Sequence, residues 1–325
     1  MYSFSGKIKL VAIISMVVGL LGIGYSFIAT PSTVEALGAH ASHDPAHAEH
    51  VLHLLQNKPW AALYVAALFF MLISLGVLAF YAINRAAQAG WSPILFRVME
   101  GITGYLPIGA LVFFLLLVFS GLHFNHLFIW MDPAVVAHDT VIQGKTGYLN
   151  VPFFLVRTAI YMLGWIAYRQ ITRKLSKAQD QAHDNRPFIK AFKWSAGFLV
   201  FFLVSESMMS WDWVMSVDPH WFSTLFGWYV FGSLITSAIA AIILVTVTLK
   251  AQGYLQQVND SHLHDLAKYL FGFSIFWTYL WFSQYLLYWY SNIPEEVTYF
   301  VTRLEHYEPI VLSMLAINFL LPLLI

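Results

Sequence analysis

Residues 205–232 read SESMMSWDWVMSVDPHWFSTLFGWYVFG and join two long apolar segments of the chain. This stretch carries four ionisable side chains, those of Glu206, Asp212, Asp218 and His220. A charge at the centre of a membrane span costs roughly 2.5–3.5 kcal/mol on insertion scales, so each of these residues needs a physical reason for its position. The stretch therefore predicts neighbouring membrane helices that hold a group of charges, and the reason for these charges depends on what surrounds them.

The composition places the chain among all-α, polytopic integral membrane proteins. Hydrophobic residues make up 59% of its 325 residues and charged residues only 10%, whereas soluble domains carry about 25% charged residues. The formal net charge is zero, which argues against nucleic acid as a partner. The chain has no cysteine, so disulfides, thiolate catalysis, cysteine-ligated iron–sulfur clusters and covalently attached c-type haem are excluded for this chain.

Eight apolar runs are near or above the length that crosses a bilayer as a helix, about 17–25 residues. We therefore predict eight transmembrane helices within a single transmembrane domain, residues 1–325. The last run reaches residue 325 without flanking polar residues, so we expect further helices beyond it. The predicted spans are residues 8–29, 60–83, 105–124, 150–171, 192–214, 224–249, 267–290 and 309–325.

The distribution of basic residues predicts that the N-terminus lies inside. Thirteen of the 17 Lys and Arg residues fall on the same side as the N-terminus, and cytoplasmic connections carry the excess of positive charge. The outer side holds Lys58, Lys145 and Arg303, while Arg157 lies within a span. The first apolar run is long for a signal peptide and no clear small-residue cleavage site follows it, so we predict a retained helix.

Histidines concentrate on the outer side of this topology. The outer loop, residues 31–59, contains five of them, and Asp44-Pro45 predicts the start of a short interfacial helix. Such a tract suits either metal binding or an amphipathic helix that touches a partner; it supplies no settled ligand geometry, so we predict no metal site. His123 and His126 end the third span, where polar interface residues are favoured over a ligand pair for b-type haem.

Two charges lie deep in neighbouring predicted spans. Arg157 is about 10 Å below the outer boundary at Asn150, and Glu206 is about 12 Å below Val214, at a rise of 1.5 Å per residue. The matching depths predict an Arg157–Glu206 ion pair. Such a pair is either a satisfied structural contact or one element of a proton path, and the residue pattern leaves both interpretations open.

The remaining charges of the opening stretch rise toward the outer face. Asp212 lies about one and a half turns nearer the surface than Glu206, and Asp218-Pro219 ends the helix just before His220. No residue is assigned a catalytic role. We predict a proton path through Glu206, Arg157, Asp212, Asp218 and His220, with polar support from Lys145, Asn150, His123 and His126.

The seventh span is unusually aromatic, with eleven aromatic side chains between Phe271 and Tyr290. Such a face suits a quinone site, because aromatic side chains stack on a quinone ring; it also suits packing and lipid contact, the favoured interpretation. A ligand pocket needs convergent polar groups as well, and this region offers Ser283, Gln284 and Asn292.

The residues SVDPHWFSTLFGWY at 216–229, with KTGYLN at 145–150 and the arginine at 157, carry a resemblance that runs along the whole chain. Together they resemble the ActF family, a family of membrane subunits of bacterial alternative complex III, a quinol:cytochrome c oxidoreductase. The Asp-Pro-His-Trp-Phe-Ser-Thr block is the most specific part of the likeness. The positions that match are Lys145, Asn150, Arg157, Asp212, Asp218 and His220.

The resemblance implies ten transmembrane helices, in two four-helix bundles plus two extra helices. It implies a chain without haem or iron–sulfur clusters of its own, in the bacterial inner membrane. Its partners would be a sister quinol-binding membrane subunit, multihaem cytochrome c and iron–sulfur subunits, and a terminal oxidase. The resemblance also implies contact with menaquinone or menaquinol and a role as proton conduit.

Two function hypotheses follow from these observations. The favoured one is a multi-pass subunit of a respiratory electron-transport complex that oxidises quinol and passes electrons to cytochrome c or an oxidase. This chain would scaffold the complex, assist quinone binding and conduct protons, without redox catalysis of its own. The rival is a stand-alone secondary transporter or channel whose buried charges form its substrate site.

Overall fold

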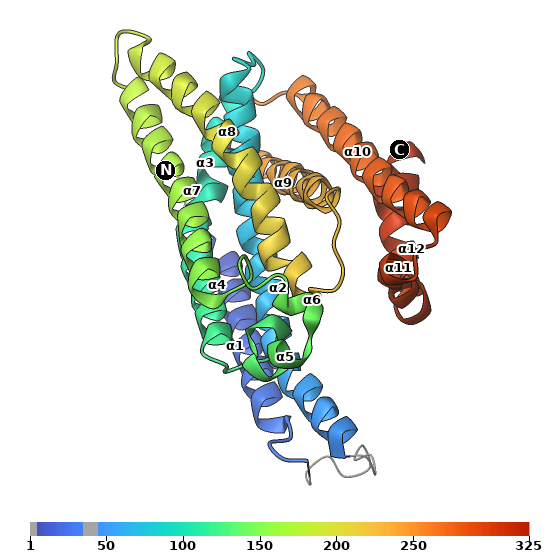
Figure 1. Ribbon diagram of the computed structural model, residues 1–325. Helices are drawn as coiled ribbons and strands as arrows, with labels where there is room; N and C mark the ends of the chain where they lie inside the picture. Colours follow the sequence, from blue (N-terminus) through green and yellow to red (C-terminus); the bar gives the residue numbers. More distant parts are fainter. Residues whose placement is uncertain (1–4, 35–44, 325) are drawn as a thin grey trace.

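The computed structural model describes residues 5–34 and 45–324, and every regular element within them is helical (Figure 1). This confirms the all-α class for the described residues. His40 and His43 lie outside them, and so do the side chains of His47 and His50. The metal-binding interpretation of the outer histidine tract therefore concerns residues outside those that the structure describes.

Seven helices of 16 residues or more form the body of the molecule. Two of them begin at capping residues: the side chain of Asn150 accepts a hydrogen bond from the amide of Phe153 at the start of one helix, and Asn259 and His262 form a capping box at the start of another. These helices are α1 (Gly6–Ala29), α2 (Pro45–Ala86), α4 (Leu106–Gly121), α7 (Val151–Gln179), α8 (Arg186–Trp213), α9 (Phe226–Ala251) and α10 (Asp260–Ser291).

Shorter elements connect and extend these helices. Two of them, α3 and η3, lead directly into α4, and α5 and α6 form a cap between α4 and α7 at the outer end. The short elements are η2 (Pro93–Leu95), α3 (Phe96–Ile102), η3 (Thr103–Tyr105), η4 (Ile129–Met131), α5 (Pro133–His138), α6 (Thr140–Gln143), η5 (Met215–Val217), α11 (Pro294–His306), α12 (Glu308–Leu315), the π-helical turn η6 (Ala316–Leu320) and α13 (Leu321–Leu324).

The structure differs from the sequence expectation at the second span. The predicted short interfacial helix does not stand alone, because α2 runs without interruption through Pro59 for 42 residues, a length of about 63 Å. A proline removes one helical hydrogen bond, and membrane helices tolerate this loss when neighbouring groups satisfy the freed carbonyl. The outer part of α2 therefore projects well beyond the roughly 30 Å of a hydrocarbon core.

Within the described residues, six helical segments are long and apolar enough to cross a membrane, which supports a multi-pass membrane protein. The predicted number of eight is not confirmed. A seventh span would need α11 and the helix that follows it to be counted together, across a bend of 96°. The segment with α10 is long enough, but it is not among the six, because its many Trp and Tyr side chains are amphipathic and lower its hydropathy.

The helices pack around α2, which contacts α4, α8 and α9. Helices α4 and α7 also touch, as do α7 and α8, so α2, α4, α7 and α8 close into a ring of four helices. Helix α9 lies against α8, and α10 lies against α9 (Figure 1). Helix α1 has no buried residue. The largest side chains with almost no exposure, Trp165 and Trp213, lie inside the four-helix ring.

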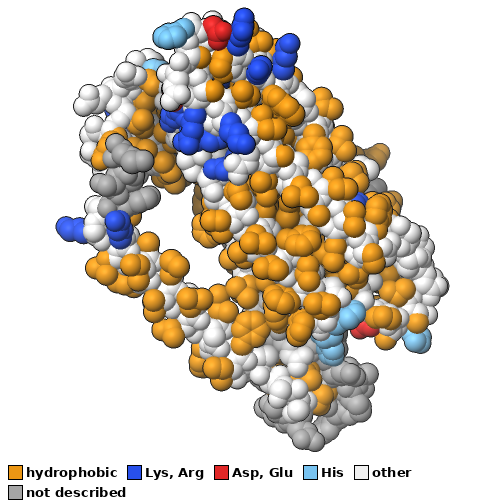
Figure 2. Space-filling view, turned by 90° about the vertical axis from the view of Figure 1, so that its left-hand side faces the viewer, with side chains coloured by type: hydrophobic (Ala, Val, Ile, Leu, Met, Phe, Trp, Pro, Cys, Tyr) orange, Lys and Arg blue, Asp and Glu red, His pale blue; other side chains and the backbone are white. Residues whose placement is uncertain are grey.

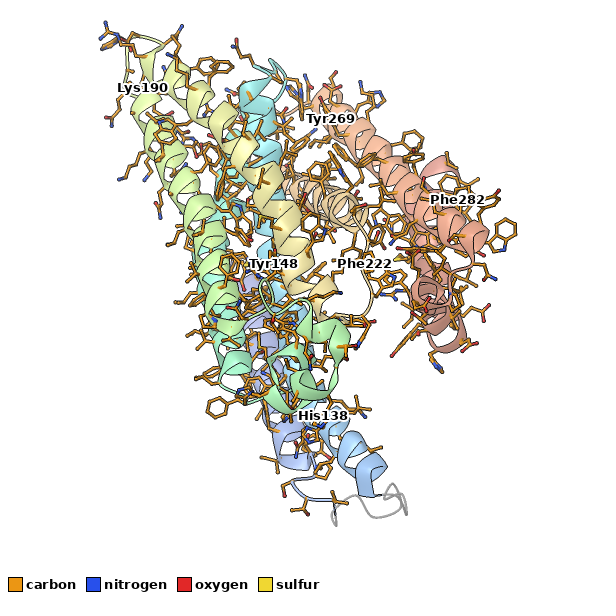
Figure 3. The ribbon with its side chains drawn as sticks, in the orientation of Figure 1. His138, Tyr148, Lys190, Phe222, Tyr269 and Phe282 are labelled. Atoms are coloured by element: carbon orange, nitrogen blue, oxygen red, sulfur yellow. The ribbon has the colours of Figure 1, made fainter. Side chains whose placement is uncertain are left out.

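The charged groups sort to the two ends of the molecule. Lys and Arg side chains gather mainly at one end, and hydrophobic side chains cover the flank below it (Figure 2). Lys190 lies at that end, and His138 lies at the opposite end (Figure 3). This separation agrees with the predicted topology, in which the basic end is cytoplasmic and the end with His138 faces outward.

The close contact between α2 and α9 at Gly76 leads to a stability prediction. A Cβ atom at Gly76 would lie 2.6 Å from the carbonyl oxygen of Leu234 and 2.8 Å from the Cβ of Ala238. We expect Gly76→Ala to destabilise the protein by about 1–3 kcal/mol through overpacking. Gly197→Ala is the control, because nothing lies within 4 Å of a Cβ there, and it should stabilise α8 by about 0.5–1 kcal/mol. Thermal unfolding in detergent measures the change in stability of both variants. Equal effects of Gly76→Ala and Gly197→Ala would contradict the close contact between α2 and α9 at Gly76.

Candidate functional site

A buried ion pair between α7 and α8 is the centre of the candidate site. The Arg157 Nε and Nη2 atoms donate to the two carboxylate oxygens of Asp212 at 3.0 and 2.9 Å. The two residues are only 4% and 0% exposed. A bidentate pair of this kind is among the strongest polar contacts in proteins, because two parallel hydrogen bonds are both charge-assisted.

Further partners complete this pair. The Tyr161 hydroxyl donates to Asp212 Oδ2 at 3.2 Å, and Arg157 Nη1 donates to the carbonyl oxygen of Tyr148 at 2.9 Å. The Arg157 guanidinium lies 3.8 Å from the ring centroid of Tyr148 and 4.2 Å from that of Phe153. Such cation–π contacts add attraction when the cation is removed from water. Both charges of the pair are therefore well compensated.

The predicted Arg157–Glu206 pair is wrong. The structure pairs Arg157 with Asp212, and Glu206 takes no part in an ion pair among the described residues. The reason is the direction of side chains, which lean toward the N-terminus of their own helix. Helix α7 begins at the outer end and α8 at the inner end, so the Arg157 side chain extends outward to Asp212 while that of Glu206 extends inward.

Glu206 is thus a buried carboxyl group without a counter-ion in the described part of the chain. It is 2% exposed, and its Oε1 atom has no hydrogen-bond partner in the part of the chain that the structure describes. Burial of a charged carboxylate without a partner costs far more than burial of a neutral carboxyl group. No cation of the described chain pairs with Glu206, so gain or loss of a proton there changes an uncompensated buried charge.

The Asp218-Pro219-His220 turn is held from the outer cap. His220 Nε2 lies 2.6 Å from Asp139 Oδ2, and Lys145 Nζ donates to the Pro219 carbonyl oxygen at 2.5 Å. The amide of Ile142 donates to Asp139. This backbone contact, helped by His220, lowers the pKa of the Asp139 carboxyl. The predicted site residues Lys145 and His220 therefore fasten the loop between α8 and α9 to the cap.

The members of the predicted proton path fall into separate groups. Glu206 and Asp212 are buried, whereas Asp218 and His220 are exposed at the outer face. Within residues 5–34 and 45–324, no direct hydrogen bond links Glu206 with Asp212, or Asp212 with His220. The predicted support residue Asn150 caps α7 and so fixes the helix that carries Arg157.

Three residues of this region were not predicted from the sequence. Tyr161 lies four residues after Arg157, and helix geometry places positions four apart on one face, so this contact had a recognisable signal. Tyr148 lies within the KTGYLN segment, but the direction of its carbonyl group depends on the loop. Asp139, the partner of His220, is 81 residues away in the chain, and no local pattern reveals that contact.

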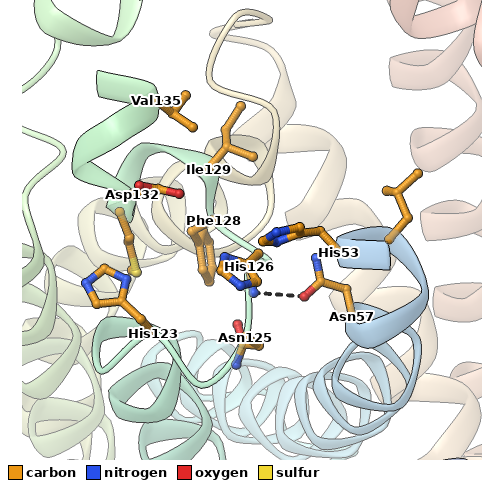
Figure 4. Close-up of a pocket in the computed structure, with 11 residues that line it drawn as sticks. His53, Asn57, His123, Asn125, His126, Phe128, Ile129, Asp132 and Val135 are labelled. Atoms are coloured by element: carbon orange, nitrogen blue, oxygen red, sulfur yellow. Dashed lines mark hydrogen bonds between the residues drawn. The ribbon is translucent and has the colours of Figure 1, made fainter. Parts of the chain in front are cut away.

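A pocket of about 320 Å³ lies beside the outer end of α2 (Figure 4). The His53 and His126 rings meet there with centroids 4.2 Å apart, and the amide of His126 donates to Asn57 Oδ1 at 2.8 Å. His123 has a positive φ of 61° and also lines the pocket. Within the described residues, no three His, Cys, Asp or Glu side chains converge so that they could hold a metal ion. The predicted support residues His123 and His126 therefore lie together, but apart from the Arg157–Asp212 pair.

A second, more aromatic cavity of about 570 Å³ lies between α9, α10 and α11. Trp221, next to His220, stacks on the Tyr299 ring at 4.2 Å, and the Arg303 guanidinium lies 3.3 Å from the same ring. Trp281 from α10 also lines this cavity. One aromatic side chain of α10, Trp281, thus lines the cavity together with the cationic Arg303, and aromatic side chains of α10 also pack against α9 and α11.

The Arg157–Asp212 pair leads to a prediction about stability. Asp212→Asn would leave a buried guanidinium without its counter-ion, and we expect a loss of about 3–5 kcal/mol. Replacement of both residues, with Arg157→Met and Asp212→Leu, should recover most of this loss because no unpaired charge remains. The free energies of unfolding of the detergent-solubilised single and double variants give the coupling energy between Arg157 and Asp212. The control is Glu206→Gln, which breaks no ion pair; the assignment of the pair is contradicted if Asp212→Asn is as mild as this control.

The outer pocket leads to a prediction about pH. Burial, together with the neighbouring His53 and His123, lowers the pKa of His126. A folded-state pKa below the unfolded value of about 6.5 means that the contribution of His126 to stability is intact above this pH and is lost as the pH falls through it. We therefore expect His126→Gln to reduce the difference in unfolding temperature between about pH 7.5 and about pH 5.5.

The control for this measurement is His183→Gln, at an exposed position in the connection between α7 and α8. It should leave the pH dependence as in the unmodified protein. An unchanged pH dependence in His126→Gln would show that other groups determine it.

Comparison with known proteins adds no further evidence about function. No protein-family model matches the chain, and no curated protein matches it. The resemblance to the ActF family therefore stays a prediction, carried by residues 145–150, Arg157 and residues 216–229. What remains as evidence about function is the arrangement of the buried charges and the cavities.

Proposed function

We propose that the protein is a multi-pass subunit of a respiratory quinol:cytochrome c, or quinol:oxidase, oxidoreductase complex in the bacterial inner membrane. In this proposal the chain crosses the membrane eight times with its N-terminus inside and contributes to two four-helix bundles. It carries no redox cofactor and no catalytic residue; it scaffolds the complex, assists quinone binding and conducts protons outward. The single observation that carries the proposal is Glu206, a buried carboxyl group that has no counter-ion among the described residues and lies beneath the Arg157–Asp212 pair.

The proton role rests on the contrast between the two buried carboxyl groups. Asp212 has Arg157 and Tyr161 as hydrogen-bond partners. Glu206 has no such partner among the described residues, so uptake and release of one proton there changes a buried charge. Intramembrane ionisable residues of this kind mark proton relays in many membrane proteins. Quinol oxidation at the outer face releases protons, and a group that accepts and passes them on suits that reaction.

The outer end offers the next acceptors in this proposal. His220 and Asp139 form an exposed pair 2.6 Å apart, and the imidazoles of His53 and His126 line the outer pocket. Imidazole changes its protonation near neutral pH, and these groups face the side where the topology predicts the outer aqueous phase. Water molecules are needed to bridge Glu206, Asp212 and His220, because no direct hydrogen bond links Glu206 with Asp212 or Asp212 with His220 in the described chain.

The aromatic cavity supports the assistance to quinone binding. Its volume of about 570 Å³ lies within the usual range for small-molecule sites, about 300–1,000 Å³. Tyr229 and Arg303 supply polar groups among aromatic walls, the combination that orients a ring by stacking and by hydrogen bonds. Menaquinone or menaquinol is the ligand that we propose. Haem c and iron–sulfur clusters belong to the partner subunits, together with a sister membrane subunit that holds the main quinol site.

The proposal is tested with the complex purified from its native membrane. We expect multihaem cytochrome and iron–sulfur subunits to co-purify with this chain. In that complex, Glu206→Gln should lower the rate of the proton release that accompanies quinol oxidation. We expect a decrease of about tenfold or more, the size of effect expected from the loss of a proton-transfer group. Stopped-flow measurement with a pH indicator gives the rate of proton release, and the absorbance of cytochrome c in the same experiment gives the rate of its reduction.

Asp218→Asn serves as the control variant for this experiment, because Asp218 is exposed to solvent and water can replace its proton-transfer role. A homo-oligomer that purifies without redox subunits would contradict the respiratory proposal and favour the rival, a stand-alone transporter or channel. Unchanged proton release in Glu206→Gln, within an intact complex, would leave this chain with the scaffolding role alone.

A further inference from the structure

At the inner end, four arginines surround one buried carboxylate. Glu100 is 7% exposed, and its carboxylate receives Arg97 Nη1 at 3.0 Å, a close contact from Arg173, and the Tyr81 hydroxyl at 3.2 Å. Arg97 also pairs with Asp180. These contacts account for two of the arginines. The other two, Arg85 and Arg169, form no ion pair with a carboxylate among the described residues.

Arg85 is the most buried of the four, at 6% exposure. Its Nε donates to the Tyr81 hydroxyl at 3.1 Å, and its guanidinium lies 4.4 Å from the ring centroid of Phe96. Arg169 is half-buried, and its Nε atom is enclosed without a hydrogen-bond partner in the described part of the chain. Four guanidinium groups and two carboxylates, those of Glu100 and Asp180, leave two positive charges uncompensated at one place.

The reason for the uncompensated charge can be traced to a glycine. Arg169 and Arg173 are one turn apart on the same face of α7, and Glu100 and Gly104 are one turn apart on the facing segment α3–η3. Arg173 meets Glu100, while Arg169 meets Gly104, where an added Cβ would lie 3.6 Å from Arg169 Nη2. Where a carboxylate partner for Arg169 would be expected, the protein therefore has no side chain.

The depth of this cluster indicates what could fill the position. Arg169 lies about 28 Å along α7 from its outer end at Asn150, at a rise of 1.5 Å per residue. The hydrocarbon core of a bilayer is about 30 Å thick, so the Cα atom of Arg169 lies close to the inner boundary of the core, next to the phospholipid headgroups. Blue side chains gather at this end of the space-filling view (Figure 2). Arginine matches phosphate because its planar guanidinium forms two parallel hydrogen bonds to two oxygens.

We propose that the juxtaposition of Arg169 with Gly104, beside the Arg97–Glu100–Arg173 network, forms a binding site for the phosphate group of an anionic phospholipid from the inner leaflet. The lipid phosphate takes the place of the missing carboxylate and neutralises the surplus charge. Its acyl chains lie along the exposed apolar surface of α7 and α4, which includes Leu163, Ile160 and Ile108. The site is separate from the proposed proton path at the other end of α7.

The test measures lipid binding to the full-length protein in detergent by native mass spectrometry and by thermal unfolding. Phosphatidylglycerol should remain bound and raise the unfolding temperature, whereas phosphatidylcholine and inorganic phosphate at the same phosphate concentration should not. Arg169→Gln should weaken phosphatidylglycerol binding by at least about fivefold, the effect of one basic residue at the membrane surface. Lys174→Gln is the matched control: it removes one positive charge at an exposed position of the same helix end and should retain binding.

A second variant tests the site without loss of any arginine. Gly104→Asp places a carboxylate beside Arg169, where the added Cβ makes an ordinary contact, and should compete with the lipid phosphate and reduce binding to a similar degree. Equal stabilisation by phosphatidylglycerol and phosphatidylcholine would overturn the proposal. So would full phosphatidylglycerol binding in both Arg169→Gln and Gly104→Asp. Stabilisation by inorganic phosphate alone would replace the lipid with a soluble anion.

Discussion

A buried guanidinium needs polar partners that compensate its charge, and the pairing of Arg157 with Asp212 organises the outer half of the helix bundle. Arg157 lies in a span from which water is excluded, and Asp212 is the carboxylate placed to satisfy it. The pair holds α7 against α8 and aligns Tyr161 and Tyr148 around it. The Asp218-Pro219-His220 turn follows directly after the helix that carries Asp212, so the pair also positions the outer loop and its contact with Asp139.

Three places in the bundle differ in how their buried charges are compensated. At the Arg157–Asp212 pair the charges balance. At Glu206 an acid is buried without a base among the described residues, and a proton is the simplest species that can neutralise it. At the inner end the arginines outnumber the acids around Glu100, and the proposed lipid phosphate completes the balance. Each imbalance points to a different mobile species, a proton toward the outer half and a phosphate at the inner leaflet.

Much of the fold could be predicted because hydrophobic length and the distribution of Lys and Arg are local properties of the chain. The long helices, their approximate bounds and the sorting of basic residues to one end all follow from them. The number of spans did not follow in full. Helix α10 is rich in Trp and Tyr, whose amphipathic rings suit a membrane interface, a protein interior or a cavity wall equally well. The predicted interfacial helix and the second span also form one continuous helix, α2, which runs through Pro59.

From the residues alone one can state that the chain is helical and membrane-embedded, and that Glu206, Arg157 and Asp212 are buried charges which need an explanation. Only the tertiary structure decided which of them pair. Side chains lean toward the start of their helix, and α7 and α8 run in opposite directions, so residues at equal depth by count are separated and Arg157 meets Asp212 instead. Contacts between distant segments, such as His220 with Asp139 and Arg169 with Gly104, depend on how helices pack, which no local spacing in the chain records.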